Sequence, residues 1–141
     1  MRRRQRSRGQ ALVEFALALP IFLMLMMAVF DLGRAIYMYN GVAQAARELA
    51  RVTSVYPGTP GALGSTTQTA AVLATQKALI PSLGNPTFTC VDIDGSSITD
   101  TCVAGMQVKV VIVAPYSPVT PGLSLVGTLN LASSSTFSIQ Q

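Results

Sequence analysis

Histidine and tryptophan are absent from this 141-residue chain, and charged residues make up only 11% of it. Histidine is the commonest general base and metal ligand near neutral pH, so its absence removes the usual chemistry of hydrolases and zinc enzymes. Soluble domains carry about a quarter charged residues, whereas half of this chain is hydrophobic. Low charge and short length together indicate one small domain joined to a segment that is not soluble.

The positive charge is concentrated at one end of the chain. Five of the ten basic residues are arginines within the first eight positions: Arg2, Arg3, Arg4, Arg6 and Arg8. Residues 52–141 hold only two lysines against three aspartates, so the larger part of the chain is slightly acidic. A nucleic-acid-binding body would carry the basic residues on its own surface. We therefore expect no nucleic-acid partner.

A long hydrophobic run follows the arginines. Residues 11–30 contain one charged residue, Glu14, and as a helix they would reach about 30 Å, the thickness of a bilayer's hydrocarbon core. Pro20 predicts a kink and not an end, because membrane helices tolerate proline. The denser positive charge precedes the run, so we expect a single pass through the cytoplasmic membrane, with the N-terminus cytoplasmic and residues 52–141 outside.

A cleaved secretory signal peptide is the alternative for this region, since it shares the basic start and the apolar run. Its apolar core is usually about 7–15 residues long, which is shorter than the run found here. Glu14 interrupts the beginning of the run, and no small-x-small cleavage motif follows Phe30 closely. A membrane anchor is therefore the favoured interpretation.

The helical pattern continues beyond the membrane run to about residue 54. Pro57 follows shortly afterwards and prevents the helix from continuing. Small residues recur at spacings that let helices approach closely; they are Gly33, Gly41, Ala45, Ala46 and Ala50. This pattern fits lateral bundling with other copies or partners as well as it fits packing on the chain's own domain. The expected organisation is a basic leader (1–9), a long helix (10–54), a linker rich in glycine and proline (55–66) and a small domain (67–141).

The small domain combines one helix with several strands. Residues 67–80 predict a helix capped by Ser65 or Thr66 and ended by Pro81. Alternating or β-branched runs predict strands at 87–93, 107–113 and 132–140, with Asp94-Gly95 as the turn after the first of them. The expected fold is α+β, in which a long N-terminal helix precedes one helix packed on an antiparallel sheet of about three to four strands.

Cys90 and Cys102 are the only cysteines. An outward location permits a disulfide, which would add about 3 kcal/mol in the chain-entropy model. Two free buried thiols are the alternative, because pairing does not follow from sequence. Two cysteines without histidine fall short of a zinc site, and Asp92 with Asp94 lacks the further ligands of an EF-hand calcium loop. We expect no metal and no cofactor.

No arrangement of side chains predicts catalysis. The chain has no nucleophile in a recognisable elbow, no histidine to serve as its base and no glycine-rich phosphate loop. We therefore expect a protein that is not an enzyme and that has no small-molecule substrate.

The junction between leader and hydrophobic run has a distinctive pattern. The basic leader ends at Gly9, and five residues later Glu14 is followed by Phe15 and an unbroken apolar run. This resembles the prepilin-peptidase site of type IV pilins, in which an intramembrane aspartyl peptidase cuts after the glycine. The resemblance implies a cut between Gly9 and Gln10, which would make Glu14 the fifth mature residue.

A carboxylate at the membrane edge is costly and needs a partner. The new amine of Gln10 would be cationic at neutral pH and lies one helical turn from Glu14. Glu14 could pair with that amine in its own chain, or with the amine of a neighbouring subunit and so set the register between helices. The alternative is a side chain that reaches the lipid headgroups beside the arginines.

Residues 8–52 resemble, more narrowly, the TadE-like pilus-assembly proteins. The matching residues are Arg8-Gly9-Gln10-Ala11-Leu12-Val13-Glu14-Phe15-Ala16, Pro20, Asp31-Leu32-Gly33-Arg34, Ala45-Ala46-Arg47-Glu48 and Ala50-Arg51. The resemblance implies a pseudopilin of the tight-adherence (Tad, Flp) system that is processed by prepilin peptidase and helps to build or prime the pilus. The implied partners are this peptidase, other pilin-like subunits, the Tad assembly machinery and the bilayer.

The length of the chain favours a minor subunit, because major Flp pilins are much shorter and almost entirely helical. The alternative hypothesis is a single-pass anchored extracytoplasmic domain that binds a surface ligand and has no connection with pili. A secreted enzyme behind a signal peptide is disfavoured by the missing histidine.

Overall fold

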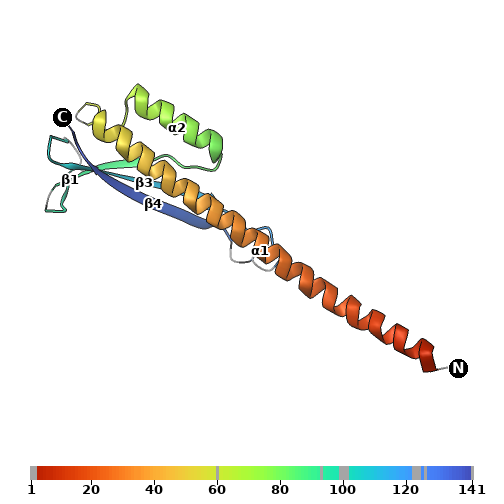
Figure 1. Cartoon of the computed structure of the whole chain (residues 1–141). Coiled ribbons are helices and arrows are strands. Elements are labelled where there is room, and N and C mark those ends of the chain that lie inside the picture. The colour runs from red at the N-terminus through yellow and green to blue at the C-terminus, as the bar shows by residue number, and fades with distance from the viewer. Residues whose placement is uncertain are drawn as a thin grey trace. The chain divides into compact units, whose positions relative to one another are not determined.

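The computed structural model describes residues 3–59, 61–92, 94–98, 102–121, 125 and 127–140. Two helices precede a sheet, in the order α1 (Arg3–Val55), α2 (Thr67–Leu79), β1 (Thr87–Val91), β2 (Ser97–Ile98), β3 (Gln107–Tyr116) and β4 (Leu129–Ser138) (Figure 1). The expected α+β class is confirmed. The chain divides into two compact units, one of Met1–Ala35 with Ser117–Thr128 and one of Ile36–Tyr116 with Leu129–Gln141.

Helix α1 begins at Arg3 and not near residue 10 as the sequence predicted, because the arginines and glutamine of the leader are themselves good helix formers. Pro20 lies inside the helix and does not end it, as expected. It is the one helix among the described residues that is long and apolar enough to cross a membrane. Its most apolar window has a mean hydropathy of 2.4 and is wholly exposed, as a lipid-facing segment would be.

In the second unit, four antiparallel strands lie in the order β2-β1-β3-β4. The short strand β2 was not predicted, and the turn at Asp94-Gly95 joins β1 to it and not to β3. Strand β3 continues three residues past its predicted end, through Pro115 to Tyr116. Among the described residues, β1 pairs with β3 only as far as Val111. Beyond Val111, β3 pairs with β4 on one side only. Pro115 is tolerated there because a strand with one partner does not need every backbone N–H for pairing.

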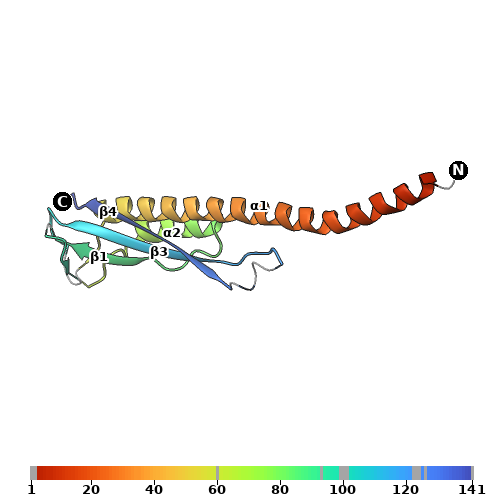
Figure 2. The same ribbon diagram turned by 90° about the horizontal axis from the view of Figure 1, so that it is seen from below.

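The core of this unit lies between one face of the sheet and the two helices. Val108, Val110 and Ile112 alternate along β3 and are fully buried, as their spacing predicted. The C-terminal part of α1 covers them with small and branched side chains, so that helix and sheet approach closely; these are Val42, Ala45, Ala46, Leu49 and Ala50. Figure 2 shows both helices on the same side of the strands.

The segment before α2 is a packed loop and not an open linker. A Cβ on Gly64 would lie 2.7 Å from the ring of Phe88, and the φ of +73° at this residue is a conformation that glycine adopts without strain. Thr66 is the N-cap of α2, and its hydroxyl accepts a hydrogen bond from the Thr69 amide at 3.2 Å. The glycine- and proline-rich sequence therefore encodes a specific turn against β1.

Cys90 and Cys102 form a disulfide in the structure, with their Cα atoms 5.6 Å apart. Cys90 lies in β1 and is almost fully buried. The bond closes a loop with a sequence separation of 12 that includes β2.

Candidate processing and assembly site on helix α1

The junction residues lie on consecutive turns of α1. The side-chain amide Nε2 of Gln10 donates a hydrogen bond to Oε1 of Glu14 at 3.3 Å, and both side chains are exposed. Apart from its chain neighbours and the backbone of its own helix, no described atom lies within 4 Å of the position that a Cβ would occupy on Gly9. The structure therefore brings residues 10 and 14 together across one turn of the helix.

The helix surface around Glu14 is apolar and uncovered. Leu12 is 69% exposed, Phe15 is 62% exposed and Leu17 is 69% exposed. These side chains point away from the axis in several directions, since successive helical residues are separated by about 100°. Glu14 is thus a single carboxylate on an apolar cylinder, available to a partner that approaches from the side.

The small residues of α1 lie in different surroundings. Ala45, Ala46 and Ala50 are fully buried in the core of their own unit. A Cβ on Gly41 would lie 2.5 Å from Cδ1 of Ile80, which follows α2, so this glycine permits close packing within the same unit. Gly33 faces open space, with no described atom within 4 Å of a Cβ position.

A buried carboxylate immediately after the hydrophobic run was not predicted to have a structural role. Asp31 is only 6% exposed. Its Oδ2 accepts hydrogen bonds from the Val119 amide at 2.9 Å, the Thr120 amide at 2.7 Å and the Thr120 hydroxyl at 2.6 Å. Arg34, one turn later, donates to the carbonyl oxygen of Ser117 at 2.9 Å. These bonds dock the loop between β3 and β4 on α1, and we call this arrangement the Asp31 latch.

The Asp31 latch satisfies a charge that would otherwise be expensive to bury. Charge-assisted hydrogen bonds to backbone amides are short and strong, and they offset the loss of water around a carboxylate. The sequence offered one signal, an acid and an arginine spaced i and i+3 directly after an apolar run. That spacing alone indicates only two side chains on one helix, whereas the hydrogen-bond partners of Asp31 lie 88 and 89 positions away along the chain.

An ion pair lies near the C-terminal end of α1. Nη2 of Arg51 is 2.6 Å from Oε1 of Glu48, and Nε donates to Oε2 at 3.2 Å. The hydrogen bond from Arg51 lowers the pKa of Glu48, with a smaller opposing effect of burial. The stabilisation is therefore present above the unfolded-state pKa of this carboxyl and is lost as pH falls through its lowered folded-state value.

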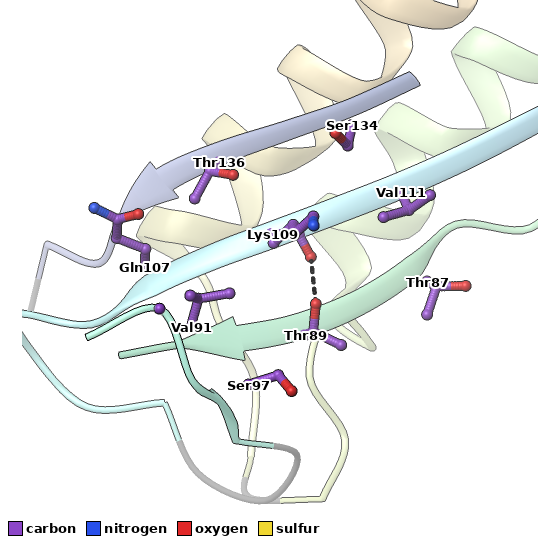
Figure 3. Close-up of a pocket in the computed structure, with 10 residues that line it drawn as sticks. Thr87, Thr89, Val91, Ser97, Gln107, Lys109, Val111, Ser134 and Thr136 are labelled. Atoms are coloured by element: carbon purple, nitrogen blue, oxygen red, sulfur yellow. Dashed lines mark hydrogen bonds between the residues drawn. The ribbon is translucent and has the colours of Figure 1, made fainter. Parts of the chain in front are cut away.

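The outer face of the sheet carries a shallow hollow of about 640 Å³ (Figure 3). Its lining consists mainly of short side chains from β1, β3 and β4, and the Thr89 hydroxyl donates to the carbonyl oxygen of Lys109 at 3.3 Å. Lys109 is the one titratable side chain among the residues that line it.

The comparisons with known proteins support the interpretation of α1. Residues 9–51 match the family model described as TadE-like protein. The match covers Gly9, Glu14, the helical half of the Asp31 latch and the Glu48–Arg51 pair, and it spans less than a third of the chain. No curated protein and no solved structure matches the chain.

The family match confirms the resemblance drawn from the sequence. Over residues 9–51 the chain is therefore similar to proteins associated with a Tad pilus. The long apolar helix is compatible with a single-pass membrane anchor in such a system.

Proposed function

We propose that this chain, which is TadE-like over residues 9–51, is a membrane-anchored minor pilin or pseudopilin that helps to assemble or prime a tight-adherence (Tad, Flp) pilus. Prepilin peptidase would cut between Gly9 and Gln10, with the leader in the cytoplasm and the sheet domain outside. The observation that carries the proposal is one continuous helix that presents Gly9 and Glu14 at the start of a fully exposed apolar run.

The local structure around Gly9 supports cleavage there. A peptidase needs the chain extended in its active site, so the helix must open around the scissile bond. Glycine in a helix costs about 0.8–1.0 kcal/mol relative to alanine, which makes opening easier at this residue than at its neighbours.

The hydrogen bond between Gln10 and Glu14 supports a role for Glu14 after processing. Cleavage would create an amine on the residue whose side chain already reaches Glu14. A cationic amine is a stronger partner for a carboxylate than an amide. The same carboxylate is exposed on the helix surface, so in an assembly it could exchange this partner for the amine of a neighbouring subunit and fix the register between the two helices.

Glu14→Ala should weaken the capture of pilin-like partners by at least about tenfold, which corresponds to about 1.4 kcal/mol, because the partner amine loses its counter-charge in an apolar setting. The measurement is co-isolation of pilin-like subunits from detergent-solubilised membranes of cells that contain the Tad machinery. Glu48→Ala is the matched control, because it removes a carboxylate from the same helix outside the apolar run.

If Glu14→Ala captures pilin-like subunits as well as the wild-type chain does, the register role is contradicted and the pilus proposal stands. If the wild-type chain captures no pilin-like subunit, the pilus proposal is wrong. The alternative, an anchored extracytoplasmic domain that binds a surface ligand, would then explain the exposed apolar helix equally well.

A further inference from the structure

We propose that the β3–β4 loop makes a second contact with the membrane, in which Val119 enters the outer leaflet beside the helical anchor. The inference rests on the proposed membrane anchoring and orientation of α1. It adds a lipid-contact site that is distant in sequence from the anchor and held against it by the Asp31 latch.

The Asp31 latch holds the β3–β4 loop against α1 at the end of the apolar run. Asp31 is the first residue after the apolar run of residues 11–30. Its carboxylate accepts hydrogen bonds from the amides of Val119 and Thr120, and Arg34 donates one to the carbonyl oxygen of Ser117. If residues 11–30 span the hydrocarbon core, this stretch of loop lies where hydrocarbon gives way to headgroups.

Apolar side chains surround this point. Val119, Met27 and Phe30 contribute to a shallow, mostly apolar hollow of about 230 Å³. Val119 is 62% exposed and Phe30 is 72% exposed, so neither is covered by described parts of the chain. Leu125, farther along the same loop, is 90% exposed. The loop therefore extends the apolar surface of the anchor sideways, and lipid that covers Phe30 would also reach Val119.

The polar groups of the loop are arranged in a way that permits this contact. Backbone amides and carbonyls without partners are costly in a membrane. Here two loop amides and one loop carbonyl are satisfied by Asp31 and Arg34, which themselves gain partners as they leave water. Residues 110–141 contain no charged side chain, so the loop brings no charge of its own toward the lipid.

Continuity with the anchor favours lipid over another protein as the occupant of this surface. The hollow includes residues of the membrane run itself, and a long basic side chain such as Arg34 commonly places its charged end among headgroups.

The absence of tryptophan from the chain allows a direct test. We would prepare three single-tryptophan variants of the full chain: Val119→Trp at the proposed contact, Leu23→Trp within the span and Ala104→Trp on the exposed surface of the sheet unit. Each is reconstituted into phosphatidylcholine–phosphatidylglycerol vesicles that contain lipids brominated either near the headgroup or deep in the acyl chain, and tryptophan emission is recorded.

We expect Val119→Trp to emit at shorter wavelength than Ala104→Trp and to lose emission most strongly with bromine near the headgroup. Leu23→Trp should lose emission with bromine deep in the chain, and Ala104→Trp should lose none. Adding Asp31→Asn to Val119→Trp should reduce the quenching, because the weakened latch no longer holds the loop at the membrane.

Two outcomes would overturn the inference and leave the proposed membrane anchoring of α1 intact. Quenching of Leu23→Trp without quenching of Val119→Trp would show that the loop stays in water. Short-wavelength emission of Val119→Trp without quenching by either lipid would show that protein covers this surface. If Leu23→Trp is also unquenched, the membrane anchoring itself is wrong and the inference falls with it.

Discussion

Replacing Asp31 with alanine should detach the loop between β3 and β4 from α1 and leave the rest of the fold in place. The substitution removes the acceptor of three hydrogen bonds and strands two backbone amides and one hydroxyl. Hydrogen bonds to a charged group are worth about 1.5–3 kcal/mol each, and part of that is regained when the freed donors meet water. We therefore expect a local loss on the order of 3 kcal/mol.

Amide hydrogen exchange measures this loss directly. In the full chain in detergent micelles, the exchange of the Val119 and Thr120 amides should become faster by roughly a hundredfold, which is the rate change that 3 kcal/mol gives when local opening limits exchange. Thr120→Val removes only the hydroxyl bond and should give an intermediate effect. The latch would be disproved if both amides kept their wild-type protection in Asp31→Ala.

Removing the disulfide should give the second large effect. The double variant Cys90→Ala, Cys102→Ala should lower the free energy of unfolding of the sheet unit by about 3 kcal/mol, because an open loop of this size leaves the unfolded chain more freedom. The unit is small and its core is thin, so a loss of this size is a large part of the stability expected for it.

Urea unfolding followed by circular dichroism, with and without a thiol reductant, tests this prediction. The wild-type chain should lose stability when it is reduced, and the double variant should already be at the reduced midpoint and should not respond to reductant. Single substitutions are avoided because they leave a free thiol that can pair between molecules. Equal midpoints for the oxidised wild type and the double variant would contradict the prediction.

Local sequence patterns were sufficient for most of the secondary structure. The alternation of Val108, Val110 and Ile112 identified a strand with one buried face, and that face is the one that packs on the helices. Thr66 carried the side chain that an N-cap requires. These features depend on neighbours within a few residues, which is why they can be recognised without knowledge of the fold.

The features that were missed depend on distant partners or on very short elements. Strand β2 has two residues, which are too few to show any alternation. It forms because its residues pair with Cys90 and Val91 of β1. The Asp31 latch joins a helix to a loop near the other end of the chain, and no periodicity connects the two. Gly41 was identified as a packing residue, but only the fold reveals that its neighbour is Ile80.

The processing of the N-terminus remains the most direct test of the central claim, that α1 is a pilin-type helix. We would determine the intact mass and N-terminal residue of the full chain extracted from membranes, after expression with and without a prepilin peptidase. A chain that begins at Gln10 only when the peptidase is present is the predicted result. A chain that begins at Met1 in both cases would contradict the claim, and one that begins well beyond Phe30 would identify the apolar run as a cleaved signal peptide.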